Sequence, residues 1–242
     1  MLSRIRAGKP SLLDARSLVK RVLVGPINTI VWPDGECPTH LFGKNAAADK
    51  INSFKFEELN REGVVQQASF KCTRYWQNEK GERIRASNDM TKVERKLSAS
   101  VPEILLLRVG ARVMVRANNI VQGVYNGMCG TITEMVANKD VVISVGAGNY
   151  RTIIRHKYFF VHEKKTLVVE QLPLCLAWAM TIHKSQGLTL NSIVLDLSKF
   201  SIFAPYQAYV GLSRARRLED IYLVNFNMSA LISDKTVSEF YD

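Results

Sequence analysis

The stretch Thr181-Ile182-His183-Lys184-Ser185-Gln186-Gly187-Leu188-Thr189-Leu190, followed by Tyr209-Val210-Gly211-Leu212-Ser213-Arg214-Ala215-Arg216, decides the architecture of this chain. Both stretches place polar, proton-donating side chains between segments that are otherwise typical of a protein core. Clustered donors of this kind suit a site that holds phosphate, from a nucleotide or from a nucleic-acid backbone.

The first stretch is predicted to be helical. Pro173 begins the helix and Gly187 ends it, the usual placement of these two residue types. Thr181, Lys184 and Ser185 then recur at helical spacing and share one side, where their donors cluster. Glycine at the end lets the backbone approach a ligand closely. Taken singly, the histidine and the lysine of this segment are more often surface groups than functional ones.

The second stretch is predicted to lie on a helix from Pro205 to about Arg217. Arg214 follows Val210 by one helical turn, whereas Arg216 points elsewhere because two residues rotate a helix by about 200°. A lone arginine on a helix is usually solvated. The small and apolar neighbours of Arg214 favour the alternative of a partly enclosed guanidinium, whose planar fork suits a γ-phosphate.

Composition adds a charge argument. The chain has 242 residues, with 33 Lys and Arg against 22 Asp and Glu, so its formal net charge is 33 − 22 = +11. A surface this positive attracts polyanions, of which DNA and RNA are the commonest; solubility alone is the other explanation. The hydrophobic content of 47% is that of an ordinary globular protein.

The cysteines and the lengths of the apolar runs indicate in which cellular compartment the protein is expected. The four cysteines form no C-x-x-C pair and have no zinc-ligand spacing to a histidine, so no metal site is expected. Free thiols fit a cytosolic, nuclear or mitochondrial protein. No apolar run approaches the length of a membrane span, and no signal core follows the N-terminal basic residues. We therefore expect no membrane association and no secretion.

The N-terminal part reads as α/β. Residues 11–24 carry apolar residues at helical spacing, with Ser11 as the expected N-cap and Asp14 in the first turn. The strand Thr39–Phe42, a polar turn and the helix Ala46–Leu59 make half of a parallel α/β unit.

A strand-rich segment follows the loop 77–90 and a short helix at 91–98. Its expected strands are Ile104–Leu107, Arg112–Arg116, Gly130–Met135, Asp140–Val145, Tyr150–Ile154 and Thr166–Val169. Their close spacing suits a small antiparallel barrel. Buried strands at 191–197 and 221–224 return the pattern to α/β. We predict one α/β domain, 1–100 with 171–242, interrupted by a barrel at 101–170.

Two further sets of residues have alternative interpretations. Arg108, Arg112 and Arg116 recur every four residues, which on one strand makes either a basic stripe for phosphate or a solvated face. Three aromatic residues are candidates for base stacking, although burial is the commoner fate of such side chains: Tyr75, Trp76 and Tyr125.

The two opening stretches, in this order, resemble the last two motifs of the petite-integration-frequency DNA helicases, relatives of RecD in helicase superfamily one. The resemblance covers nearly the whole chain. It implies a RecA-like, P-loop-NTPase-type second motor domain with an inserted Src-homology-type β-barrel, and Leu107–Gly130 resembles the opening of that barrel. ATP, Mg²⁺ and single-stranded DNA are the implied ligands.

The resemblance also implies roles. Arg214 corresponds to an arginine finger, and the segment 181–187 to the element that couples nucleotide to DNA. Its Gln186-Gly187 end is expected near the nucleotide; the residues expected near DNA are Thr181, His183, Lys184 and Ser185. Arg112 and Arg116 are candidate phosphate contacts. Asn45 is either a helix cap or, as the family pattern implies, a residue facing the nucleotide cleft.

Half of the family's machinery is missing from the sequence. There is no G-x-x-x-x-G-K-[ST] string and no adjacent Asp-Glu pair to hold Mg²⁺. In the family these parts belong to a first motor domain, which we expect to be supplied in cis or in trans. ATP and Mg²⁺ would then be held mainly by that domain, and the chain alone should be inactive.

The sequence thus predicts the C-terminal motor half of an ATP-dependent, 5′-to-3′ DNA helicase, in the nucleus or mitochondrion of a eukaryote or in the cytoplasm otherwise. The alternatives are a single-strand-binding module without a catalytic role and an inert gene fragment.

Overall fold

A computed structural model describes residues 1–25, 32, 37–61, 63, 66–84, 91–137, 139–146, 148–198, 201–202, 204 and 206–231. The chain forms two compact units: unit 1 is Met1–Lys55 with Ala177–Asp242, and unit 2 is Phe56–Leu176. None of the described helices is long and apolar enough to cross a membrane.

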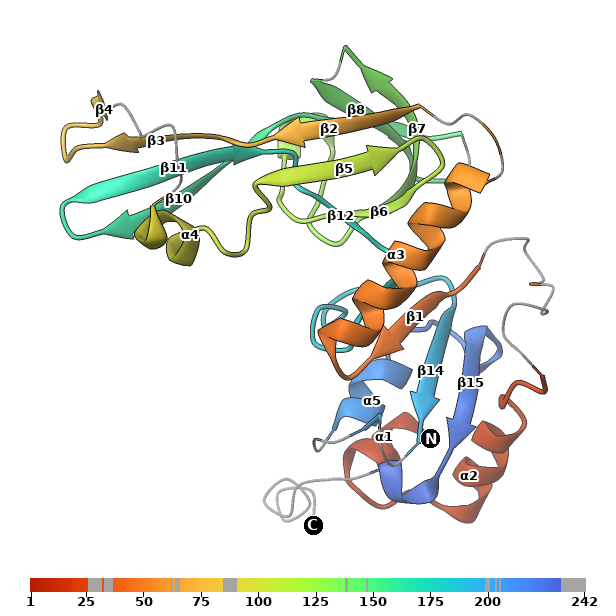
Figure 1. The fold of residues 1–242 in the computed structure, drawn as a ribbon. Helices are drawn as coiled ribbons and strands as arrows, with labels where there is room; N and C mark the ends of the chain where they lie inside the picture. The colour runs from red at the N-terminus through yellow and green to blue at the C-terminus, as the bar shows by residue number, and fades with distance from the viewer. Residues whose placement is uncertain are drawn as a thin grey trace. The chain divides into compact units, whose positions relative to one another are not determined.

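Unit 1 is built on a four-stranded parallel sheet in the order β13-β1-β14-β15 (Figure 1). Its strands are Ala179–Thr181, Thr39–Phe42, Ile193–Leu197 and Ile221–Phe226 in that order. Residues of these strands are largely buried, as expected where a parallel sheet is covered on both faces. Leu41, Leu195 and Leu223, for example, are all buried.

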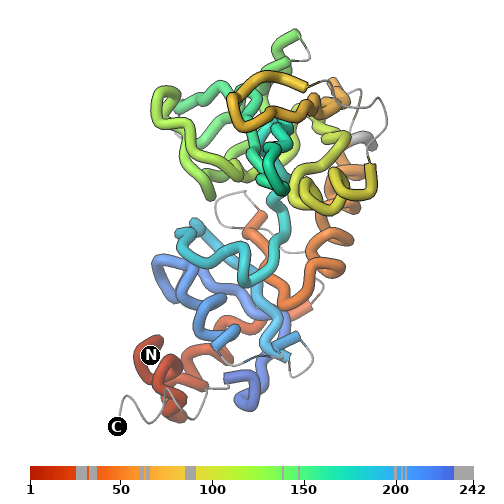
Figure 2. The backbone as a smooth tube through the Cα atoms, turned by 90° about the vertical axis from the view of Figure 1, so that its left-hand side faces the viewer, coloured from red at the N-terminus to blue at the C-terminus, as the bar shows by residue number. Residues whose placement is uncertain are grey.

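Four helices belong wholly or partly to this unit: α1 (Leu2–Arg6), α2 (Leu12–Val19), α3 (Asn45–Arg61) and α5 (Gln207–Leu212). Figure 2 shows the N-terminal segment in red beside the C-terminal segment in blue, where α1 contacts α5 and α2 contacts β15. The approach of α5 to β14 requires a glycine, because a Cβ on Gly211 would lie 3.0 Å from the Leu195 side chain.

Helix α2 begins as the sequence predicts but buries a different face. Ser11 caps it and forms a capping box with Asp14. The helix ends at Val19 rather than near residue 24, because the chain turns and Val22 bridges to Leu223. Of the apolar positions expected to face the core, Leu18 is buried, whereas Leu12, Leu13 and Val19 are exposed.

The segment 173–187 is not the predicted helix. Leu174–Leu176 (β12) pairs with β6, and β13 pairs with β1. An apolar run of this kind fits a buried strand as well as a helix, and the tertiary pairing decides between them. Helix α5 is likewise shorter than expected, so Arg214 lies two residues beyond its end.

Unit 2 contains three antiparallel sheets. They comprise β10-β11-β3-β4, β12-β6-β7-β8-β9 and β2-β5. The bounds are β2 Gln67–Lys71, β3 Thr73–Gln77, β4 Arg83–Ile84, β5 Ile104–Arg108, β6 Arg112–Val115, β7 Cys129–Val136, β8 Asp140–Ser144, β9 Tyr150–Ile153, β10 His156–His162 and β11 Lys165–Gln171. All six strands expected between 104 and 169 are present, each within two residues of its predicted ends.

Helix α4 (Lys92–Leu97) closes a small core against the first of these sheets. Its Glu94 is buried and accepts a hydrogen bond from Trp76 Nε1 at 2.8 Å. Leu97 and Trp76 pack against Leu167 and Val169 of β11. The short helix expected at 91–98 is thereby confirmed.

The boundaries between the two compact units lie at 55/56 and 176/177, whereas the sequence placed those of the predicted barrel at 100/101 and 170/171. The reason is strand pairing: β2 pairs with β5 and β3 with β11, so residues 67–77 join the strand-rich unit. The sequence analysis had assigned no strand to them. The residue boundaries proposed for a motor domain and a barrel stay a prediction.

Asp14 is expected to stabilise unit 1 in a pH-dependent way. Its carboxylate accepts from Arg4 Nη2 at 2.6 Å and from Ser11 N at 2.9 Å, and these donors hold its pKa well below the usual range. Asp14→Asn should cost about 1–2 kcal/mol of unfolding free energy at about pH 7. A depressed folded-state pKa stabilises above the unfolded pKa, so this difference should shrink at about pH 3.

Urea unfolding of the two proteins at both pH values measures this difference. The matched control is Asp49→Asn, an exposed carboxylate on α3, whose effect should stay within about 0.5 kcal/mol. An Asp14→Asn loss that is equally large at both pH values would contradict the ionic origin.

The β10–β11 turn offers a stabilising substitution. Glu163 has φ +52° in this two-residue connection, a conformation that costs energy for any residue with a Cβ. Glu163→Gly should therefore raise the unfolding free energy by about 0.5–1 kcal/mol in urea melts. Lys164→Gly, where φ is not positive, should give no gain; a gain of equal size there would disprove the strain argument.

Candidate functional site

The candidate site begins at the carboxyl ends of two neighbouring parallel strands. Phe42 of β1 pairs with Thr181 of β13, and Ile182 N donates to Phe42 O at 2.9 Å. The turns 43–45 and 182–187 therefore leave the same edge of the sheet. In open α/β folds this edge is where ligands bind.

Residues 182–187 form a tight turn, which is stabilised by hydrogen bonds among its own polar groups. Ser185 N donates to Thr181 O at 3.1 Å, and Lys184 N donates to Thr181 Oγ1 at 3.3 Å. The Ser185 hydroxyl donates to Ile182 O at 2.7 Å. Gly187 has φ +81°, which a side chain would strain, so glycine at this position is explained by conformation.

Arg214 fastens this turn to the end of α5. Its Nη1 donates to Ser185 O at 3.3 Å and to Leu188 O at 3.1 Å, on the two sides of the exposed Gln186-Gly187 pair. Its Nε donates to Val210 O at 2.8 Å. The guanidinium is half-buried. The two sequence stretches that carry the resemblance are therefore in direct contact.

The predicted ligand contacts divide into two groups by exposure. His183, Lys184 and Gln186 present their side chains to solvent. Thr181 and Ser185, by contrast, are buried, and each uses its hydroxyl within the turn. In this structure these two side chains shape the turn, and their direct contact with DNA stays a prediction.

Asn45 and Asn52 lie on α3 with different surroundings. Asn45 is the exposed first residue of the helix, directly after the turn that leaves β1. Among the hydrogen bonds of the described residues, none joins it to Arg214. Asn52 forms two hydrogen bonds with the backbone of Ala179. Its Nδ2 donates to Ala179 O at 2.8 Å, and Ala179 N donates to Asn52 Oδ1 at 2.9 Å. It thereby fixes β13, a role that the sequence did not suggest.

Asp196, at the carboxyl end of β14, is a further polar group that the sequence analysis overlooked. Burial alone would raise its pKa, but hydrogen bonds from Ser201, Ser198 and Asn225 outweigh burial and lower the pKa. The carboxylate therefore stays ionised at the same edge of the sheet. An aspartate followed by serine two residues later is a local signal for such a turn.

The proposed arginine stripe of unit 2 does not form. Arg108 is buried, lies over the Phe56 ring at 4.2 Å and donates to Gln67 and to the Phe56 carbonyl. Its Nη1 also lies 3.6 Å from Glu57. A turn separates Arg108 from Arg112, so the three arginines do not share one strand. Arg112 is half-buried on β6, and Arg116 is exposed just after it.

The three aromatic candidates for base stacking also differ in their exposure to solvent. Tyr75 is buried beneath Arg83, whose guanidinium lies 4.3 Å from the ring centroid. Trp76 is partly buried and bonded to Glu94. Tyr125 is 52% exposed and is the one of the three that a base can reach.

The described part of the chain contains no cluster of three or more His, Cys, Asp or Glu side chains that could hold a metal ion. The exposed Gln186-Gly187 turn instead offers a guanidinium, that of Arg214, directly beside it. No disulfide joins the four described cysteines, at 37, 72, 129 and 175.

Known proteins with similar sequences are helicases. The chain is 31% identical over 206 residues to the ATP-dependent DNA helicase Pif1 of Bdellovibrio bacteriovorus, covering 84% of this chain and 43% of that protein. It is 34% identical over 165 residues to human ATP-dependent DNA helicase PIF1, covering 66% of this chain and 25% of the human protein. No family model matches the chain.

Solved structures agree. Bacteroides Pif1 in complex with ADP-AlF4 has a TM-score of 0.70 and 26% identity, over 99% of this chain and 51% of that one. Candida albicans Pif1 has a TM-score of 0.71 and 25% identity, over 99% and 56%. Bacteroides Pif1 bound to single-stranded DNA has a TM-score of 0.65. The chain thus has the helicase fold and spans about half the length of these proteins.

The Arg214 contacts predict a specific stability effect. Lysine keeps the charge but cannot donate to several carbonyls in one plane, so Arg214→Lys should loosen the 182–187 turn by about 2 kcal/mol. Native-state hydrogen exchange measures this as faster exchange at the Ser185 and Leu188 amides. Arg216→Lys, on an exposed neighbour, is the control. Equal protection of both amides in the two variants would show that Arg214 does not hold the turn.

Proposed function

Since this chain is homologous to the Pif1 family of ATP-dependent DNA helicases, we propose that it acts as the C-terminal motor half of such a helicase. In this role Arg214 is the arginine finger and the segment 181–187 couples the nucleotide to single-stranded DNA. The chain spans 43% of the Bdellovibrio protein, so the remaining parts of the motor are assigned to a first motor domain in cis or in trans.

The contact of Arg214 with the 182–187 turn is the observation that carries this proposal. A guanidinium that moves towards a γ-phosphate must give up some of its bonds to Ser185 O and Leu188 O. The turn is then free to change shape. Because His183 and Lys184 project from the same turn, such a change alters how they meet a DNA strand.

The nucleotide is proposed to bind between two domains. On this chain Gln186, Gly187, Asn45 and Arg214 are the candidate contacts. The described residues offer a guanidinium and an exposed turn to phosphates but no set of carboxylates to Mg²⁺. We therefore assign Mg²⁺ and most contacts to ATP to the first motor domain. A half-buried arginine supplied opposite that site would stabilise charge on the transferring phosphoryl group.

Unit 2 is proposed to contain the inserted Src-homology-type barrel. The five-stranded sheet β12-β6-β7-β8-β9 has four consecutive antiparallel pairings, which suit such a barrel. Arg112 on β6 and Arg116 directly after it remain candidate phosphate contacts. The proposed compartment is the nucleus or mitochondrion of a eukaryote, or otherwise the cytoplasm.

A non-catalytic single-strand-binding module is the second candidate. It is favoured by the engagement of Arg214 with three backbone carbonyls of its own chain, together with a net charge of +11. Such a module would bind DNA with an affinity that no nucleotide changes.

Binding of a labelled oligothymidylate, followed by fluorescence anisotropy at about 50 mM and about 200 mM salt, tests the DNA contact. Lys184→Ala should weaken binding and reduce the salt slope by about 0.7, the loss of one phosphate contact on a single strand. Lys50→Ala, another exposed lysine of unit 1, is the control and should leave the slope unchanged. Equal slopes for the two variants would contradict a DNA role for the turn.

Phosphate release tests the catalytic half. The chain alone should hydrolyse no appreciable ATP, and adding a Pif1 first motor domain should restore DNA-stimulated turnover that Arg214→Ala reduces by about 10³-fold or more. Robust turnover by the chain alone, abolished by the same substitution, would refute the assignment. Absence of any turnover with the added domain, combined with nucleotide-independent DNA binding, would favour the module.

A further inference from the structure

A short loop of unit 2 exposes two apolar side chains to an unusual degree. Ile120 is 77% exposed and Val121 is 97% exposed, within the 3₁₀ turn η2 (Ile120–Gln122) that links β6 to β7. Single exposed apolar residues are common, but two adjacent β-branched ones at the tip of a loop lose hydrophobic stabilisation without a compensating contact.

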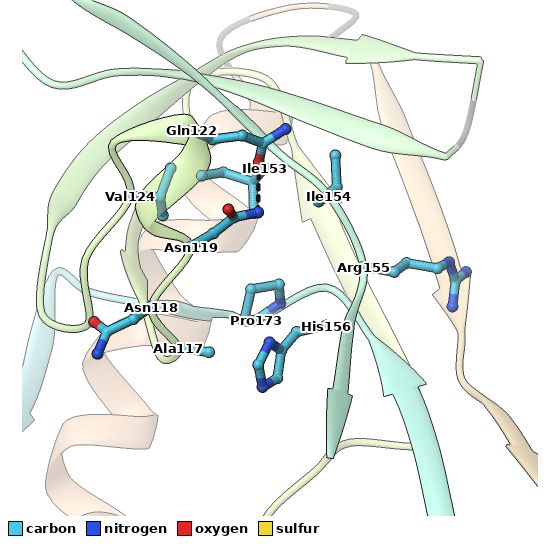
Figure 3. A pocket seen from close by; sticks show the side chains of 10 residues that line it. All are labelled: Ala117, Asn118, Asn119, Gln122, Val124, Ile153, Ile154, Arg155, His156 and Pro173. Carbon is cyan, nitrogen blue, oxygen red and sulfur yellow. Dashed lines mark hydrogen bonds between the residues drawn. The ribbon is translucent and has the colours of Figure 1, made fainter.

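Hydrogen bonds fix the base of this loop and thereby hold its tip in one conformation. Asn119 N donates to Val124 O at 2.7 Å, and Val124 N donates back at 2.9 Å. Inside this bridge, Asn119 Nδ2 donates to Gln122 Oε1 at 3.0 Å (Figure 3). Gly123 takes φ +63° and its carbonyl accepts from Arg151 Nε at 3.3 Å. Each bond fixes the base of the loop and leaves the tip free.

The tip does not belong to the interior of the unit. A cavity beneath the loop is lined by residues on both sides of the tip, among them Asn119, Gln122 and Val124 (Figure 3). Ile120 and Val121 are not part of that lining. A preorganised apolar tip of this kind suits binding, because little conformational entropy remains to be lost.

The segment that contains the tip and the segment that contains Arg151, which bonds to the loop, are both basic. Residues 104–133 contain three arginines and no Asp or Glu, and residues 141–162 contain two arginines and a lysine and again no acid. Arg116 and Arg151 flank the loop and use only some of their N–H donors on carbonyls. This charge fits a polyanion rather than an apolar pocket on another protein.

We propose that Ile120 and Val121 form an apolar wedge that inserts between neighbouring bases of single-stranded DNA. Arg116 and Arg151 contact the flanking phosphates, and Tyr125, which directly follows the bridge, stacks on a displaced base. Aliphatic wedges that part stacked bases and aromatic rings that receive them are both established modes of nucleic-acid binding. The inference rests on the proposed function, since it assumes that the chain binds DNA.

An adenine-rich oligonucleotide with a central 2-aminopurine tests the wedge, because 2-aminopurine brightens when it is unstacked. Wild-type chain should raise its fluorescence on binding. The double variant Ile120→Ser with Val121→Ser should lose that rise and bind about tenfold more weakly, the loss of a stacked contact. Its salt slope should stay unchanged, because no phosphate contact is lost, whereas Arg151→Gln should lower the slope by about 0.7.

The matched control is Ile104→Ser with Leu106→Ser, two exposed apolar residues of β5 in the same unit, which should keep the fluorescence rise. Circular dichroism melts verify that all variants fold. Retention of the rise in the wedge variant would overturn the wedge alone. The wedge would also be overturned if the wild-type chain self-associated without DNA and the wedge variant did not. That result would assign the tip to a protein contact. A wild-type chain that binds no oligonucleotide would overturn the proposed function as well.

Discussion

The guanidinium of Arg214 joins the two segments on which the candidate site depends. Its bonds to Val210 O, Ser185 O and Leu188 O tie the end of α5 to the turn that leaves β13. The same turn is anchored on its other side by Ile182 N to Phe42 O. One side chain thus connects α5 with the edge of the sheet. Movement of that side chain would change the hydrogen bonds on both sides of the exposed Gln186-Gly187 pair.

Local patterns in the sequence identified most of the elements. Ser11 and Asp14 mark the start of α2 through a capping box, and six strands between 104 and 171 follow from alternation and turn residues, although β10 was not expected. Strands β12 and β13 could not be identified in this way. Their residues form an apolar run without a period, and only pairing with β6 and β1 makes them strands.

The site was predictable in its residues but not in their roles. The proximity of Arg214 to the Gln186 turn agrees with expectation. The burial of Thr181 and Ser185 was not expected, because a helix at 173–187 would have turned their side chains outward. The actual turn uses their hydroxyls in hydrogen bonds within the turn. Arg108 shows the same limit: its spacing predicted either a basic stripe for phosphate or a solvated face, whereas its contacts with Phe56 and Gln67 bury it.

The strand order β13-β1-β14-β15 has a consequence for biosynthesis. Thr39–Phe42 lies between two strands that the ribosome makes more than a hundred residues later. Unit 2, which is continuous in sequence, is complete before either neighbour of β1 exists. Domains generally fold as they emerge, so the strand-rich unit would assemble first and the parallel sheet last. Nascent chains would therefore carry an apolar, unpaired β1 for some time, a natural target for chaperones.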